Sequence, residues 1–236
     1  MSWRIEEADA LVLLRELPDG WAQTCVARPP RGGDPERTLA ILDEVRRVLR
    51  DDGTLWVLLQ RDQLFLPVEL REEGWTQRPA PEWAERATRD AHGEAARLFL
   101  FTKQRRHFFL DADPIAARDR SSSALCVSMS RQARRVQTCI PAREHERGLA
   151  LIKRCILAGS SLLACRTCGA PYQRTRPGED ALGVRRPTCA HNNPGGCCLV
   201  LDPFYDRAGI PTGEAALHTG RSFLGITEPT EKGERR

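Results

Sequence analysis

The sequence predicts an α/β fold in which a mostly parallel central sheet is flanked by helices. Short apolar runs of strand length alternate with longer segments whose apolar residues recur at helical spacing. The runs 54–59 and 98–102 are apolar almost throughout, which is typical of strands buried on both faces of a sheet. The length of 236 residues and the 41% of hydrophobic residues suit one domain of ordinary size with a small inserted module.

The predicted elements follow one another along the whole chain. Strands are expected at 21–27, 54–59, 98–102, 199–201 and 222–226. Helical spacing covers 5–17, 36–50, 62–73, 149–157 and 212–219. Polar residues predict a loop over 78–95, and the segment 103–147 is rich in arginine and poor in apolar runs. We expect this segment to be a loosely structured, basic part of the surface.

Composition and charge restrict the classes of protein. No run of 18 apolar residues occurs, so no membrane span is predicted. The first residues lack the basic and apolar regions of a secretion signal, and a cytoplasmic protein is expected. The net charge is +4, and only three of the 36 basic residues are lysine. Because the arginine fork suits phosphate, nucleic-acid contact is permitted, although genomic base composition also explains a high arginine content.

Five of the nine cysteines lie between residues 165 and 198. The other four are scattered and are expected to be small core residues, because disulfides are rare in the cytoplasm. Cys165 and Cys168 have the spacing of a metal knuckle with a glycine after the second cysteine, and Cys189 and His191 follow about twenty residues later. These four ligands predict a structural zinc site that holds a small ribbon. Cys197 or Cys198 is the alternative fourth ligand, and a reduced, metal-free loop is the alternative to zinc.

The segment from Leu199 to Phe204 predicts a ligand-binding corner. Asp202 follows directly after a buried strand, and ligands of open parallel sheets bind at the carboxyl ends of the strands. A carboxylate at this place is able to orient the polar groups of a cofactor. A helix and a second buried strand follow, which completes a β-α-β unit.

These segments resemble the DNA amino-methyltransferases, which modify N6 of adenine or N4 of cytosine. The resemblance rests on Leu201-Asp202-Pro203-Phe204 and on Gly220-Arg221-Ser222-Phe223-Leu224-Gly225-Ile226. Further matches are Asp9-Ala10-Leu11, Leu17-Pro18-Asp19-Gly20, Pro29-Pro30, the segment from Glu44 to Trp56, and Arg154-Cys155-Ile156-Leu157-Ala158-Gly159-Ser160. Their order is that of the permuted subgroup, in which the catalytic motif precedes the cofactor motif, and some members carry a Cys-x-x-Cys-Gly insertion before Asp-Pro-Phe.

The resemblance implies a Rossmann-like methyltransferase fold that binds S-adenosylmethionine and DNA. Residues 1–160 would form the catalytic-motif part, with 103–147 as a short recognition segment. Residues 161–198 would form the zinc-ribbon-like insertion, and 199–236 the cofactor-motif part. The implied cofactor-binding residues are Asp9, Gly159, Ser160, Asp202, Pro203, Phe204, Gly225 and Glu228.

The catalytic tetrad departs from the family pattern of Asp, Asn or Ser, then Pro-Pro, then an aromatic residue. In the family, the first side chain and a backbone carbonyl accept hydrogen bonds from the target amino group, and the aromatic ring stacks on the flipped base. This chain has Arg28-Pro29-Pro30-Arg31. Arginine has donors and no acceptor, and its charge repels the sulfonium of the cofactor.

The cofactor motif departs as well. The family has a Gly-Ser-Gly-Thr-Thr turn after Asp-Pro-Phe, whereas residues 205–211 are bulkier and about two residues longer. The acidic residue that holds the ribose hydroxyls is expected directly after Gly225-Ile226, where Thr227 stands, and Glu228 follows one place later.

Three hypotheses follow from these residues. The first is a methyltransferase homologue with absent or very weak methyl transfer that still binds DNA or a partner protein. The second is an active DNA methyltransferase with a rewired site, in which Glu228 replaces the ribose acid. The third is a zinc-ribbon interaction module on an inert scaffold.

Overall fold

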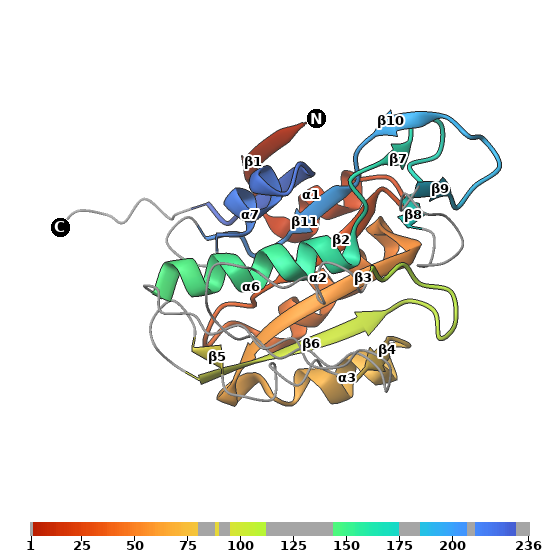
Figure 1. Ribbon diagram of the computed structural model, residues 1–236. Helices are drawn as coiled ribbons and strands as arrows, with labels where there is room; N and C mark the ends of the chain where they lie inside the picture. The colour runs from red at the N-terminus through yellow and green to blue at the C-terminus, as the bar shows by residue number, and fades with distance from the viewer. Residues whose placement is uncertain are drawn as a thin grey trace.

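The structure is a computed structural model, and it describes residues 2–79, 88–89, 95–111, 144–174, 185–206 and 211–229. One central sheet runs through the molecule, with helices on both of its faces (Figure 1). Most of the predicted loop 78–95 and of the basic segment 103–147 lies outside the described residues. Among the described helices, none combines the length and apolar character needed to cross a membrane.

The central sheet has the strand order β1-β12-β11-β2-β3-β6-β4, and β5 pairs with β6. Five neighbouring strands are parallel, namely β1 (Trp3–Glu7), β12 (Ser222–Thr227), β11 (Leu199–Asp202), β2 (Ala22–Ala27) and β3 (Leu49–Gln60). The antiparallel strand β6 (Ala95–Thr102) separates β3 from the short β4 (Thr76–Arg78), and β5 (Thr88–Arg89) lies at the edge. The predicted α/β fold with a mostly parallel sheet is confirmed.

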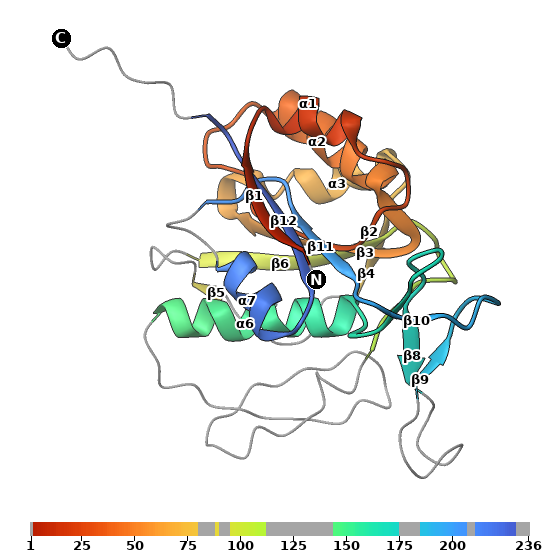
Figure 2. The same cartoon turned by 90° about the horizontal axis from the view of Figure 1, so that it is seen from above.

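Two layers of helices cover the two faces of the sheet (Figure 2). One layer contains α1 (Ala10–Glu16), α2 (Pro35–Val48) and α3 (Leu66–Glu72), and the other contains α6 (Glu144–Gly159) and α7 (Thr212–His218). The alternation of β3 explains both cores. Leu55, Val57 and Leu59 belong to the first core cluster, whereas Trp56 and Leu58 belong to the cluster that packs under α6 and α7.

Two predicted helix boundaries were wrong. Residues Trp3–Glu7 form the strand β1, and the predicted helix 5–17 begins only at Ala10, where the Asp9 carboxylate accepts a hydrogen bond from the Val12 amide. The predicted helix 36–50 ends at Val48, because Leu49 already enters β3 opposite Ala22. Sheet pairing overrides the helical spacing at both places. The predicted helix 62–73 is divided into a short 3-10 turn (Arg61–Gln63) and α3.

The cysteine-rich module forms two small sheets of its own. The strand β7 (Ala164–Cys165) pairs with β10 (Pro194–Gly196), and β8 (Tyr172–Arg174) pairs with β9 (Arg185–Pro187). This ribbon connects the end of α6 to the beginning of β11. It therefore lies at the amino ends of the parallel strands, and Figure 1 shows it at the C-terminal end of α6.

Candidate functional site

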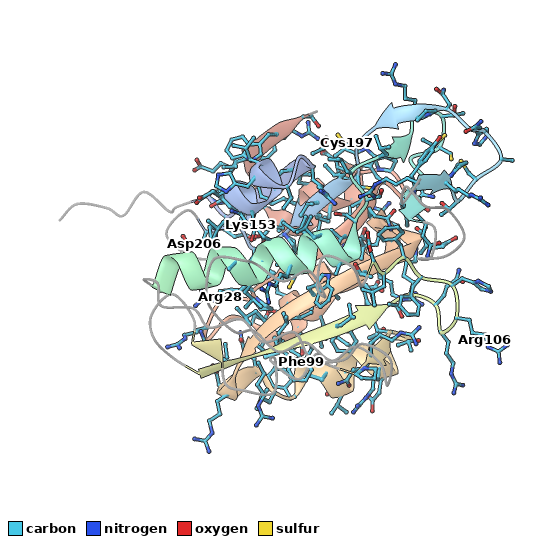
Figure 3. The ribbon with its side chains drawn as sticks, viewed as in Figure 1. Arg28, Phe99, Arg106, Lys153, Cys197 and Asp206 are labelled. Carbon is cyan, nitrogen blue, oxygen red and sulfur yellow. The ribbon has the colours of Figure 1, made fainter. Side chains whose placement is uncertain are left out.

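A cleft opens where the carboxyl ends of the parallel strands meet. Its volume is about 430 Å³, within the usual range of small-molecule sites. It is lined by Arg28, Pro29, Pro30, Arg31, Gln60, Asp202, Phe204, Tyr205, Asp206, Ile226, Thr227 and Glu228. The structure thus brings the four tetrad positions together with three of the predicted cofactor residues, although they lie about 170 residues or more apart in the sequence. Figure 3 shows Arg28 and Asp206 near the N-terminal half of α6.

Asp202 forms the buried floor of the cleft. Its side chain is almost fully buried, and its Oδ1 atom accepts a hydrogen bond of 3.1 Å from the Phe204 amide. Burial, with a smaller contribution from the charge of Asp206, raises the pKa of Asp202 to about 7. The neighbouring Thr212 hydroxyl, the Phe204 amide and the positive charge of Arg28 oppose this rise. The floor of the cleft therefore changes its charge near neutral pH.

The turn that carries the tetrad is held by a glutamine. The side-chain amide of Gln63 donates to the carbonyl oxygens of Pro29 (3.1 Å) and Pro30 (2.9 Å), and its own oxygen accepts from the Gln60 amide (3.1 Å). Gln63 and Pro29 are both buried. The carbonyls of the two prolines are consequently partnered within the protein.

The side of the cleft formed by β12 is covered by an aromatic ring. The Tyr205 amide donates to the Ile226 carbonyl (2.9 Å), and the Tyr205 ring packs edge-on against Phe223 with 5.5 Å between the ring centroids. A Cβ atom on Gly225 would lie 2.8 Å from the Tyr205 ring. Gly225 is therefore required by the packing of Tyr205, and it lies beneath that ring rather than in the cleft lining.

An ion-pair cluster joins the rim of the cleft to two helices. Arg37 of α2 lies 2.8 Å from the Glu228 carboxylate and 2.9 Å from the Asp9 carboxylate. The Ala10 amide at the start of α1 also donates to Glu228 (3.4 Å). The hydrogen bond from the Val12 amide and the ion pair with Arg37 hold the pKa of Asp9 below its usual value. Glu228 thus reaches the cleft, but its carboxylate is engaged by Arg37.

Gly159 and Ser160 lie away from the cleft. A Cβ atom on Gly159 would be 2.6 Å from the Thr24 hydroxyl and would also collide with the Thr54 hydroxyl. Buried Arg221 donates to the carbonyl oxygen (2.8 Å) and the hydroxyl (3.2 Å) of Ser160. In this structure both residues pack the end of α6 onto the sheet, so their predicted contact with a cofactor stays a prediction.

The four predicted metal ligands come together in the ribbon. The ligand atoms of Cys165, Cys168, Cys189 and His191 all lie within 4.8 Å of one another. The turn between the first two is closed by a hydrogen bond of 2.8 Å from the Gly169 amide to the Cys165 carbonyl, and Gly169 has a φ of 71°. Burial raises the pKa of Cys165, but hydrogen bonds from the backbone of the knuckle and from the neighbouring thiols lower it to about 6. Three sulfurs and one imidazole at this spacing fit a tetrahedral zinc ion.

The two vicinal cysteines are not part of this cluster. The Cys197 sulfur lies 3.0 Å from the Ser222 hydroxyl. Cys198 is buried, and burial raises the pKa of its thiol to about 12. Of the fourth ligands considered from the sequence, the structure therefore brings His191 to the cluster.

Several solved structures share this architecture. A protein of Thermus thermophilus, TTHA0409, assigned as a DNA modification methylase, is 16% identical with a TM-score of 0.55, and the match covers 96% of this chain and 89% of that one. The cytosine-N4-specific PvuII DNA methyltransferase is 13% identical with a TM-score of 0.53, covering 97% and 82% of the two chains. The chain has the fold of the DNA methyltransferases.

The sequence comparisons cover less of the chain. The Type II methyltransferase M.XycI of Xanthomonas campestris pv. cyanopsidis is 39% identical in an alignment of 69 residues that covers 22% of this chain. The match spans only 23% of the length of M.XycI. No family model matches the sequence. The likeness to DNA methyltransferases thus rests on the fold along the whole chain and on one short stretch of sequence.

Within this DNA methyltransferase fold, several cleft residues were missed by the sequence analysis. Gln60 directly follows the predicted strand 54–59, and Tyr205 and Asp206 directly follow the predicted Asp-Pro-Phe segment, so their positions gave a signal. Arg37 gave none, since its partner Glu228 lies 191 residues away.

Proposed function

We propose that this chain is a DNA amino-methyltransferase homologue with absent or very weak methyl transfer, which binds DNA at the cleft edge. The observation that carries the proposal is that residues 28–31, which stand at the tetrad positions, line the cleft. Arg28 and Arg31 line the cleft with Asp202, and the carbonyl oxygens of Pro29 and Pro30 already accept from Gln63. Each of these carbonyls keeps a second lone pair, but at the first tetrad position Arg28 offers donors and positive charge where the family requires an acceptor for the target amino group.

The residues for S-adenosylmethionine fit only in part. A neighbour with a TM-score of 0.56, TTHA0409, was solved as a complex with this cofactor. In this chain Asp202, Phe204 and Glu228 face the cleft, as a cofactor site in this fold requires. Against a fit, Arg37 engages Glu228, and the positive charge of Arg28 acts on Asp202 at the same place. We derive no methyl-transfer step from this arrangement.

DNA is the partner that best suits the edge of the cleft. Arg31 is exposed and Arg28 is partly exposed beside it. Two arginines at the carboxyl edge would serve as phosphate contacts, and binding would then weaken as salt rises. A protein partner that recognises this edge is the second class of ligand that the first hypothesis allows.

We further propose that the cysteine cluster holds a structural zinc ion. The donor set of three thiols and one imidazole leaves no open position for a substrate. The small cluster formed by Cys165, Ala170 and Tyr172 is the only buried core of the ribbon among the described residues. Metal binding would therefore supply the stability that this core lacks. The separate small sheets of the ribbon support the expected division of the chain into the parts 1–160, 161–198 and 199–236.

Two alternatives remain distinct from this proposal. An active methyltransferase with a rewired site is favoured by the size of the cleft and by the buried carboxylate of Asp202. A zinc-ribbon interaction module on an inert scaffold is favoured by the separate small sheets of the ribbon.

Calorimetry with S-adenosylmethionine tests the proposal directly. We expect no heat of binding at millimolar cofactor, whereas a micromolar dissociation constant would establish the rewired enzyme. The double variant Arg28→Asp with Arg31→Tyr restores the family tetrad. If the wild type transfers methyl groups to duplex DNA at a measurable rate that this variant does not exceed, the proposal is wrong.

DNA binding needs a separate measurement with a matched control. In fluorescence anisotropy with a 25-base-pair duplex, Arg28→Ala with Arg31→Ala is expected to weaken binding about tenfold and to reduce the salt dependence, as expected for the loss of one to two phosphate contacts. The control is Arg15→Ala with Arg71→Ala, which removes the same charge from exposed positions of α1 and α3. Equal affinity of the two double variants would contradict DNA binding at the cleft edge.

A further inference from the structure

A second basic surface lies at the opposite end of the sheet from the cleft. It comprises Arg105 and Arg106 in the loop after β6, and Arg166 of the ribbon, and we call it the ribbon edge. All three side chains are exposed. Because β6 is antiparallel and Thr102 pairs with Thr54, this loop emerges at the amino ends of the parallel strands, where the ribbon also lies. Figure 3 shows Arg106 on the side of the molecule away from Arg28 and Asp206.

The loop of the ribbon edge is held in shape by a partly buried cation. Arg78 of β4 donates to the carbonyl oxygens of Gln104 (2.8 Å) and Arg105 (2.6 Å), and its guanidinium lies 4.0 Å from the centre of the Phe108 ring. Burial, together with the nearby charge of Arg105, lowers the pKa of Arg78. These contacts fix the loop, although they bring the positive charges of Arg78 and Arg105 close together. The Arg105 side chain remains exposed to solvent.

The first residues of β3 form hydrogen bonds both to the loop after β6 and to the ribbon, and we call them the base of the ribbon edge. Arg50, at the start of β3, donates to the Cys168 carbonyl of the ribbon (2.6 Å). The Phe109 amide donates to the Asp52 carbonyl (2.8 Å), and Lys103 donates to the Leu49 carbonyl (2.8 Å). The loop and the ribbon are thus both anchored on the first residues of β3, so that their arginines belong to one extended surface.

The acidic groups around this base are already neutralised. Asp51 pairs with Lys103 (3.1 Å), and Asp52 pairs with Arg50 (3.3 Å). Asp19 lines a hollow of the surface together with Asp51 and Asp52, and it pairs with Arg47 (2.6 Å). In the part of the chain that the structure describes, no ion pair joins Arg105, Arg106 or Arg166 to a carboxylate. The ribbon edge therefore has a net positive charge.

We propose that the ribbon edge is a second nucleic-acid contact, which binds the phosphate backbone of duplex DNA independently of the cleft. Arginine suits phosphate because its planar fork donates two parallel hydrogen bonds. From Thr54 to Gln60 the strand β3 extends roughly 20 Å, so one phosphate cannot contact both surfaces. The inference goes beyond the proposed function, since it holds whether or not the cleft edge binds DNA.

The test uses the full chain and a 25-base-pair duplex in fluorescence anisotropy between 50 and 300 mM salt. Arg105→Ala with Arg106→Ala is expected to weaken binding by at least about tenfold and to lower the slope of log K against log salt by about 2, close to 0.9 for each lost phosphate contact. Arg78 donates to backbone carbonyls, so the loop keeps its shape in this variant. Arg166→Ala is expected to lower the slope by about 1.

The control is again Arg15→Ala with Arg71→Ala, with circular dichroism to show that all variants are folded. If the Arg105 and Arg106 variant has the same affinity and slope as this control, the proposal is wrong. It is equally wrong if the variant loses binding to poly-glutamate but keeps its binding to DNA, since the surface then recognises an acidic polypeptide. A combined variant with Arg28→Ala and Arg31→Ala separates the two sites: independent contacts multiply their fold-changes, and a silent cleft pair contradicts only the cleft proposal.

Discussion

The buried carboxyl group of Asp202 makes the stability of the protein depend on pH. The pKa of Asp202 is about 7 in the folded chain, compared with 3.8 for an unburied aspartate. Below about pH 3 the group is protonated in both states and leaves stability unchanged. As the pH rises towards 7, the unfolded chain loses this proton first, so the free energy of unfolding decreases. The full difference of about three pKa units corresponds to about 4 kcal/mol above pH 7.

The substitution Asp202→Asn removes this titration and retains the oxygen that accepts from the Phe204 amide. Between pH 5 and pH 8, the wild type is expected to lose about 2 to 3 kcal/mol more than the variant. Urea unfolding followed by tryptophan fluorescence at a series of pH values measures the difference. Asp43→Asn, on an exposed position of α2, controls for the loss of one charge.

Arg28 provides an internal check on this reasoning. Its positive charge lowers the pKa of Asp202 in the folded chain. Arg28→Ala should therefore leave the onset of the decrease in stability unchanged, because the unfolded chain sets that onset, and should extend the decrease to a higher final pH. Parallel stability curves for the wild type and Asp202→Asn would refute the argument, because the carboxyl group would then titrate alike in the folded and unfolded chains.

Three further substitutions test other parts of the structure. Cys165→Ser is expected to abolish zinc binding and to expose the amides of the ribbon alone, measured by metal analysis and hydrogen exchange. Gly159→Ala is expected to lower the free energy of unfolding by about 1 to 3 kcal/mol, because the added methyl group meets two threonine hydroxyls. Arg37→Ala is expected to change stability by less than about 1 kcal/mol, since the pair is exposed, and to raise the pKa of Asp9 in an NMR titration.

Each of these variants has a matched control. Cys197→Ser removes a cysteine outside the cluster and should retain the metal. Gly148→Ala lies in the same helix as Gly159, and its methyl group would meet only Pro211 at 3.8 Å. It should therefore stabilise the helix by about 0.5 to 1 kcal/mol. Arg37→Lys should keep much of the depression of the Asp9 pKa. The opposite outcome in any pair would contradict the role assigned to that residue.

The sequence analysis correctly predicted those elements in which the apolar residues are the ones that are buried in the structure. Strand β3 is the best example, because Leu55 to Leu59 are buried on alternating faces against two helix layers. Strand β1 was missed, because its residues are mostly exposed at the sheet edge and its acidic and apolar residues continue into the helical spacing of 5–17. The pairing partner that makes it a strand is β12, more than 200 residues away. Such distant pairing leaves no local signal.

The candidate site was predicted where its residues belong to a local pattern of the sequence. Asp202 was predicted because it follows directly after a buried strand, and the tetrad was predicted from the resemblance to the methyltransferase family; both lie at strand ends, which meet at one edge. The cysteine cluster was recognised from ligand spacing, which local geometry imposes. The side chains of Gln63 and Arg37 were not recognised, because their roles depend on hydrogen bonds that cross from one element to another.

These cross-element contacts change the meaning of the departures from the family pattern. The carbonyls of the prolines are bound by Gln63, Glu228 is bound by Arg37, and the space above Gly225 is filled by Tyr205. These neighbours engage the proline carbonyls and Glu228 and fill the space at Gly225, so they shape the cleft together with the tetrad. Replacing the tetrad arginines alone would therefore leave Gln63, Arg37 and Tyr205 in contact with the cleft.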